Sequence, residues 1–82
     1  MHVHVKLFAS LREQAGWGER RLELPGDTAS PSDLWCLLAQ ELQLGPQCPA
    51  TIRVAINQHF AAVETPLEEG DEVAFLPPIS GG

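Results

Sequence analysis

Residues 30–44 read SPSDLWCLLAQELQL, and this stretch decides the fold. Its leucines recur at spacings of three and four residues, at Leu34, Leu37, Leu38 and Leu42. That period predicts a helix with one apolar stripe, which Trp35 flanks. A helix with a single apolar stripe needs another layer to cover it, so the rest of the chain has to supply that surface.

The flanks of this stretch predict where the helix begins and ends. Ser30 is the expected N-cap, because its hydroxyl can accept a hydrogen bond from a free backbone N–H. Pro31 then stands at the first helical position, where its missing N–H does no harm. Asp33 lies in the first turn, where the helix dipole favours an anion. Gly45-Pro46 predicts that the helix ends near Leu44.

Upstream of the helix, residues 2–8 and 19–24 alternate between apolar and polar side chains, which predicts two strands. Their separation favours an antiparallel pair with a wide connection. Within that connection, Ser10 is the expected N-cap of a short helical turn, with Glu13 at the capping-box position and Gly16 as its stop. The side chains expected to point inward are Val3, Val5, Leu7, Leu22 and Leu24.

Downstream of the helix, strands are predicted over residues 51–57, 60–63 and 72–76, with a turn at Asn57-Gln58. The order strand, strand, helix, strand, short strand, strand is that of the β-grasp, or ubiquitin-like roll. In this α+β fold a mixed sheet of four to five strands packs against one main helix. The first and last strands are expected in parallel at the sheet centre. The inward side chains expected here are Ile52, Val54, Ile56, Val73 and Phe75.

We expect one domain over residues 1–76 and an extended tail over residues 77–82. Pro77-Pro78 fixes φ and favours an extended root. Gly81-Gly82 lacks Cβ atoms, so it can pass through a narrow channel, and we expect the Gly82 carboxylate to be the reactive group. An ionised carboxylate is a poor electrophile and needs activation. Adenylation by ATP followed by attack of a sulfur donor would give a thiocarboxylate, and no side chain of this chain is needed for that chemistry.

The composition limits the partners. The chain has 82 residues, with 11 acidic against 5 basic side chains and a net charge of −6. Nucleic acid is therefore not expected as a partner, and basic protein surfaces are favoured. No apolar run approaches the roughly 20 residues that span a membrane, and the N-terminus lacks a signal-peptide pattern, so we expect no membrane and a cytoplasmic location. The single lysine, Lys6, poorly suits a modifier that builds chains on itself.

Other side chains suggest chemistry less strongly. His2 and His4 share a strand face, but without a third ligand we expect neither a metal site nor a bound cofactor. Cys36 is expected to be a part-buried packing residue and Cys48 an exposed, inert thiol. The acidic run has two compatible interpretations, a solvated turn and an electrostatic contact to basic partners. It comprises Glu64, Glu68, Glu69, Asp71 and Glu72.

Three segments resemble the small subunit of molybdopterin synthase, the MoaD type of sulfur carrier. They are Leu7-Phe8-Ala9-Ser10-Leu11-Arg12-Glu13, Val54-Ala55-Ile56-Asn57-Gln58, and the ending GDEVAFLPPISGG at residues 70–82. The resemblance extends over nearly the whole chain. The ending is its most specific part.

This resemblance implies a sulfur-donor subunit with no active site of its own. Gly82 would be adenylated by an E1-like activating enzyme that uses MgATP, and would receive sulfur from a sulfurtransferase. The tail would then enter the large catalytic subunit, commonly in a heterotetramer, and give sulfur to a cyclic pterin precursor of molybdopterin. The residues implied to enter are Pro77, Pro78, Ile79, Ser80, Gly81 and Gly82.

The family's docking patch maps to Phe8, Phe60 and Leu76, where Leu76 departs from the commoner Phe. By alternation, Phe8 and Leu76 point away from the helix, and apolar residues grouped on an exposed face often mark an interface. The sequence departs from the family again in the loop from Gly45 to Pro49. Two alternatives stay open: a carrier for thiamine or cysteine synthesis, and a ubiquitin-like modifier joined to lysines through Gly82.

Overall fold

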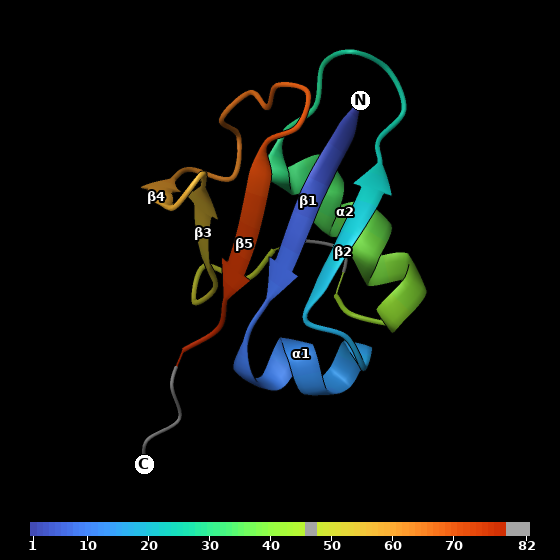
Figure 1. The fold of residues 1–82 in the computed structure, drawn as a ribbon. Helices are drawn as coiled ribbons and strands as arrows, with labels where there is room; N and C mark the ends of the chain where they lie inside the picture. Colours follow the sequence, from blue (N-terminus) through green and yellow to red (C-terminus); the bar gives the residue numbers. More distant parts are fainter. Residues whose placement is uncertain (46–47, 79–82) are drawn as a thin grey trace.

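The computed structural model describes residues 1–45 and 48–78 (Figure 1). Five strands form one sheet in the order β2-β1-β5-β3-β4, and α2 packs across one of its faces. The elements are β1 (His2–Leu7), α1 (Ala9–Ala15), β2 (Glu19–Glu23), α2 (Pro31–Leu42), β3 (Arg53–Ile56), β4 (His59–Ala61) and β5 (Glu72–Leu76). The predicted mixed sheet with one main helix is confirmed.

The central strands pair as predicted. β1 and β5 run in parallel, with Val5 opposite Val73, whereas β1–β2, β3–β4 and β3–β5 are antiparallel. Asn57 and Gln58 both have positive φ, 51° and 71°, and form the two-residue turn between β3 and β4. β3 and β4 are shorter than expected, and β4 begins one residue before Phe60.

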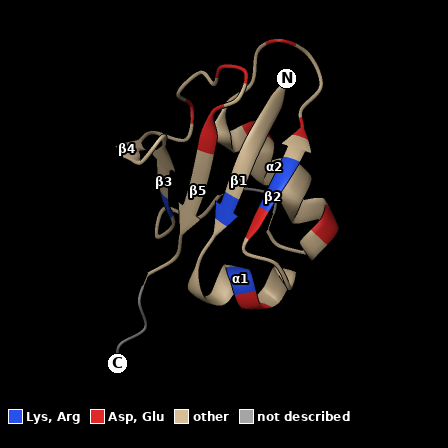
Figure 2. Cartoon of the chain, in the orientation of Figure 1, with Lys and Arg blue, Asp and Glu red and all other residues tan. Residues whose placement is uncertain are grey.

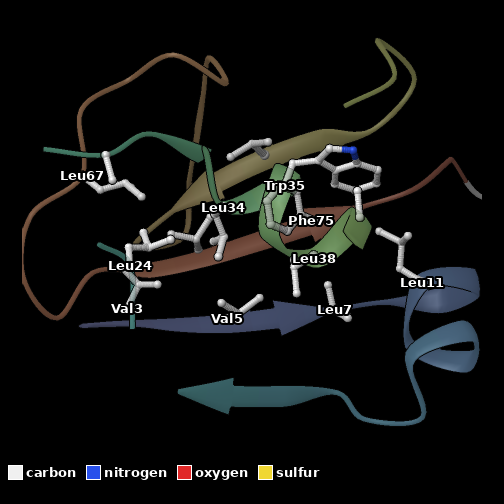
Figure 3. Packing of buried hydrophobic residues seen from close by; sticks show 14 residues of the cluster. Val3, Val5, Leu7, Leu11, Leu24, Leu34, Trp35, Leu38, Leu67 and Phe75 are labelled. Atoms are coloured by element: carbon white, nitrogen blue, oxygen red, sulfur yellow. The ribbon is translucent and has the colours of Figure 1, made fainter. Parts of the chain in front are cut away.

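The core lies between the sheet and α2 (Figure 3). Val5, Val73 and Phe75 are fully buried from the sheet side. Trp35 meets the Phe75 ring edge-on at a centroid distance of 5.5 Å, and its Nε1–H donates to the Gly45 carbonyl at 3.0 Å. The indole therefore belongs to the core rather than flanking the stripe.

The apolar stripe of α2 is rotated from the predicted one. Leu34 and Leu38 are buried as expected, but Leu37 is 38% exposed while Trp35 and Ala39 are buried. The large indole takes the inward position because its single polar atom finds a backbone acceptor there.

The start of α2 is as predicted and its end is not. The Ser30 hydroxyl accepts a bond from the Asp33 N–H, and the Asp33 carboxylate accepts one from the Ser30 N–H, which completes a capping box. The helix ends at Leu42, where Gln43 adopts φ 59° and its N–H bonds the Ala39 carbonyl. Gly45 is therefore not the cap, and Pro46 lies outside the described residues.

Three further predictions are wrong. Ser10 does not cap α1, because the extended Phe8 is the N-cap and makes no side-chain cap bond; Gly16, with φ 83°, does end the helix. Leu24 is buried as predicted but follows β2 instead of ending it. Cys36 is exposed, since it lies off the inward face of α2.

Candidate functional site

The face of the sheet that α2 leaves uncovered carries a shallow groove of about 330 Å³. We call it the outer groove. It is lined by Lys6, Phe8, Ala55, Gln58, Phe60, Glu72, Ala74 and Leu76. Its residues come from four of the five strands and the turns beside them, so the sheet itself holds it in shape.

Small side chains make the floor of the outer groove. Ala55 and Ala74 are Cα partners on β3 and β5 and are 8% and 6% exposed. Phe60 stands opposite Ala55, and Lys6 stands opposite Ala74, in the same row across the sheet. The two alanines therefore leave a hollow between longer side chains.

All three residues predicted for docking line this groove. Phe60 is 68% exposed and Phe8 is 42% exposed, while Leu76 is half-buried at the end of β5. Phe8 and Phe60 are two of the three large hydrophobic side chains classed as exposed among the described residues. The fold buries neither of them, which is unusual for phenylalanine and typical of a contact surface.

Charged side chains close one side of the groove. Lys6 Nζ lies 3.1 Å from Glu72 Oε1 and 4.0 Å from Glu19 Oε1. His4 Nε2 lies 2.7 Å from the same Glu19 oxygen. The hydrogen bond with His4 lowers the pKa of the Glu19 carboxyl, and the nearby Lys6 charge adds to this effect. Lys6 is thus held beside the apolar surface by two carboxylates.

Arg53 is a residue of this face that the sequence reasoning missed. Its guanidinium carbon lies 5.6 Å from the centroid of the Phe60 ring, and its Cα pairs with that of Leu76. The alternation that turned Val54 and Ile56 inward also turned Arg53 and Ala55 outward. That alternation could have placed Arg53 on the outer face from the sequence, but only the register between β3 and β5 shows that it lies opposite Leu76.

The tail root leaves the sheet beside this groove. Pro77 and Pro78 directly follow β5, the middle strand, and leave at the end of the sheet where α1 lies (Figure 1). Pro77 is half-buried and Pro78 exposed. Ile79, Ser80, Gly81 and Gly82 lie outside the described residues, so the predicted reactive end is not part of this geometry.

The two histidines face different carboxylates. His2 Nδ1 lies 3.4 Å from Glu69 Oε2, whereas His4 pairs with Glu19. The bond that Glu69 accepts from the His2 backbone N–H lowers the pKa of that carboxyl. No group of three His, Cys, Asp or Glu side chains that could hold a metal was found within residues 1–45 and 48–78.

Cys48 is partly buried rather than exposed, and burial raises the pKa of its thiol. A raised pKa lowers the thiolate fraction at neutral pH, and the thiolate is the form that reacts.

The acidic run occupies the loop between β4 and β5 and the first residue of β5, at the end of the sheet opposite Pro77 (Figure 2). Much of it is used within the fold. Asp71 accepts bonds from Asn57 Nδ2 at 2.9 Å and from the Glu68 N–H at 2.8 Å. Glu69 bonds the His2 N–H, and Glu72 pairs with Lys6. The run is therefore more than a solvated turn.

None of the helices in the described part of the chain has the length and apolar character needed to cross a membrane.

Comparison with known proteins adds independent information. The model of the ThiS family matches residues 5–82. The molybdopterin synthase sulfur carrier subunit of Chlamydomonas reinhardtii is 39% identical over 87 residues, covering 100% of both chains. The crystal structure of SAMP1 from Haloferax volcanii superposes with a TM-score of 0.85 at 32% identity, covering 100% of both chains.

A second similar structure is a complex of two different subunits. It is the complex of subunits 1 and 2 of the molybdopterin-converting factor from Helicobacter pylori, with a TM-score of 0.67 and 25% identity over 100% of both matched chains.

Proposed function

The chain belongs to the ThiS family, and from its similarity to a molybdopterin synthase sulfur carrier subunit over the whole chain we propose that it is the sulfur-carrier subunit of a molybdopterin synthase. The observation that carries the proposal is the placement of the tail root beside the outer groove. Leu76 lines the groove, and Pro77 and Pro78 follow it without a loop. A partner that grips the groove would therefore also receive the tail.

The proposed chemistry takes place at the Gly82 carboxylate. A carboxylate oxygen attacks the α-phosphorus of ATP and displaces pyrophosphate, which gives an acyl adenylate. A persulfide of the sulfur donor then attacks the carbonyl carbon and AMP leaves, which gives an acyl disulfide. A second thiol of the donor attacks the donor-side sulfur, so the thiocarboxylate is released and the donor is left as a disulfide. The thiocarboxylate sulfur finally attacks a cyclic pterin precursor and displaces an oxygen substituent. Water then cleaves the resulting thioester, which leaves the sulfur on the pterin and restores the Gly82 carboxylate. In this scheme MgATP is bound by the activating enzyme, and this chain supplies the carboxylate and its delivery.

The proposed partners follow from these steps. An E1-like enzyme adenylates the tail, a sulfurtransferase supplies sulfur, and a large catalytic subunit accepts it, in an assembly of two small and two large subunits. A cytoplasmic location suits a reaction that consumes ATP. The Helicobacter pylori complex supports the large-subunit partner, because its matched chain is paired with a second subunit.

Removal of Gly82 tests this proposal directly. We expect the truncated chain to lose all sulfur transfer in a molybdopterin assay with activating enzyme, sulfur donor and large subunit. Its Tm should stay unchanged, because no core residue is touched. Intact-mass analysis of the full chain isolated from cells should show the mass increase that replacement of one oxygen by sulfur gives. Analysis of fragments should place this increase at the C-terminus. Molybdopterin formation by the truncated chain would refute the mechanism.

A second candidate function is covalent protein modification. The specific observation in its favour is the similarity to SAMP1 of Haloferax volcanii. A second solved structure from that organism, which this chain also resembles, is described as small archaeal modifier protein 1. Modification would use the same activated Gly82, with a lysine amine replacing the sulfur donor. Recovery of lysine conjugates from cells that express a tagged chain would favour this function, and their absence beside an abundant thiocarboxylate would favour sulfur transfer.

A further inference from the structure

Arg53 is an exposed charge that the described fold leaves without a carboxylate. Lys6, the one basic residue that lines the outer groove, pairs with Glu72, and Arg20 pairs with Glu41. Arg12 and Arg21 also take part in none of the ion pairs among the described residues, but neither of them lies next to Leu76 or Phe60 in the strand register. None of the ion pairs among residues 1–45 and 48–78 includes Arg53. Its guanidinium carbon instead lies over the Phe60 ring, 5.6 Å from the ring centroid.

The position of Arg53 makes this lack of a partner informative. It stands opposite Leu76, where the outer groove meets the tail root. Figure 2 shows the basic residue at the start of β3 and the acidic loop between β4 and β5 at the other end of the sheet. The net charge of −6 therefore does not describe the local charge at the groove.

Covering Phe60 would also remove water from Arg53. A partner that packs on the ring approaches the guanidinium stacked against it. A guanidinium that loses water without gaining an acceptor is strongly unfavourable. Its planar fork of N–H groups fits a carboxylate better than it fits a single carbonyl oxygen.

We propose that the protein surface docking on the outer groove carries a carboxylate that pairs with Arg53 above the Phe60 ring. This inference rests on the proposed function, since it takes the docking protein to be the large subunit. It makes Arg53 a specificity-determining residue: a large subunit with an apolar or basic group at that point binds poorly. It also reverses the expectation from net charge, because the partner is acidic where it meets this end of the groove.

Binding measurements with charge-changing variants test the inference. Titration calorimetry with the large subunit would compare the unaltered chain with Arg53→Gln and Arg53→Lys. Arg21→Gln is the matched control, because it removes the same charge from an exposed position on β2, outside the groove. We expect Arg53→Gln to weaken binding about tenfold, Arg53→Lys to lose less, and Arg21→Gln to stay within about twofold. The Arg53→Gln loss should shrink between about 0.05 M and about 0.3 M salt.

Chemical cross-linking can locate the carboxylate. A carbodiimide joins amines to carboxylates without a spacer, and Lys6 is the chain's one native lysine. The Arg53→Lys variant should therefore form one cross-link to the large subunit that the unaltered chain does not form. Mass spectrometry of the digested product would identify the acidic residue.

Each outcome decides something. Equal binding by the unaltered chain and Arg53→Gln would overturn this inference and leave the proposed function standing. Equal losses of affinity in Arg53→Gln and Arg53→Lys that do not change with salt would overturn it too, because they indicate packing on the ring without charge pairing. If the unaltered chain fails to bind the large subunit at all, the proposed function fails and this inference with it. Tm values of all variants exclude misfolding as the cause.

Discussion

The two faces of the sheet are formed by the same alternating strands, but one face is covered by α2 and the other is exposed. On the α2 side, Val5, Val73 and Phe75 are wholly buried. On the other side, Phe60 and Phe8 stay exposed around a floor of alanines. Both faces carry large apolar side chains, but only one has a layer of the same chain to cover it.

This difference separates residues that hold the fold from residues that wait for a partner. Burial of an apolar side chain stabilises the chain that buries it, whereas an exposed phenylalanine contributes little to folding and raises the risk of aggregation. The outer face therefore gains its free energy only when another protein covers it. Substitutions on the two faces should accordingly affect different measurements.

The largest expected effect is on the α2 side. Phe75→Ala removes a ring at 0% exposure that contacts Trp35, so it should lower the free energy of unfolding by about 3–5 kcal/mol. Urea denaturation followed by Trp fluorescence would measure this loss. A domain of this size has a small reserve of stability, so partial unfolding at room temperature is an acceptable form of the same result. A loss below about 1 kcal/mol would mean that the face is not packed as described.

On the outer face, Phe60→Asp should give the opposite pattern. We expect binding to the large subunit to weaken by about 2 kcal/mol or more, as for a buried aromatic anchor. The free energy of unfolding should change by less than about 0.5 kcal/mol, because the ring is 68% exposed. Calorimetric titration and urea denaturation of the same preparation would provide both numbers. A large stability loss with intact binding would place the ring in the core and remove the contrast between the faces.

A smaller effect is expected from the cap of the covering helix. Ser30→Ala removes the hydroxyl that accepts the Asp33 N–H, and should cost about 1 kcal/mol of stability. Binding at the outer groove should not change, since α2 lies on the other face of the sheet. Thermal unfolding and titration would separate the two effects. A binding defect in this variant would show that the faces are coupled.

The smallest effect is a pH dependence on the polar rim of the outer face. The pKa of Glu19 is lowered from its ordinary 4.5 by the His4 hydrogen bond, with Lys6 and Arg12 nearby. A lowered folded-state pKa means that the stabilisation is present above the unfolded value and is lost as pH falls through the folded value. The stability difference between the unaltered chain and Glu19→Gln should therefore shrink from about pH 6 to about pH 3. A difference that grows in acid would contradict this assignment.

The strand pattern could be predicted from the sequence because alternation depends on local chemistry. β5 has the predicted bounds, Val73 and Phe75 point inward as predicted, and the parallel pairing of β1 with β5 follows from the element order. The Ser30 cap was equally readable, since a capping side chain acts within its own turn.

Features that depend on distant residues were not readable in this way. Trp35 lies in the core because its ring packs edge-on against Phe75 and its N–H bonds the Gly45 carbonyl. The spacing of residues along α2 reveals neither contact. The leucine spacing therefore predicted burial for Leu37, which is exposed. For the site, the identities of Phe8, Phe60 and Leu76 came from resemblance and alternation, but the pairing of Arg53 with Phe60 and Leu76 needed the cross-strand register.

The central place of β5 has a mechanical consequence. This strand is hydrogen-bonded to β1 on one side and β3 on the other, and it runs straight into Pro77. A force that draws on the tail acts along the strand axis, so it strains both ladders in shear instead of peeling one bond after another. A partner enzyme that draws the tail into its active site, or releases it, can therefore load the tail while the domain stays folded.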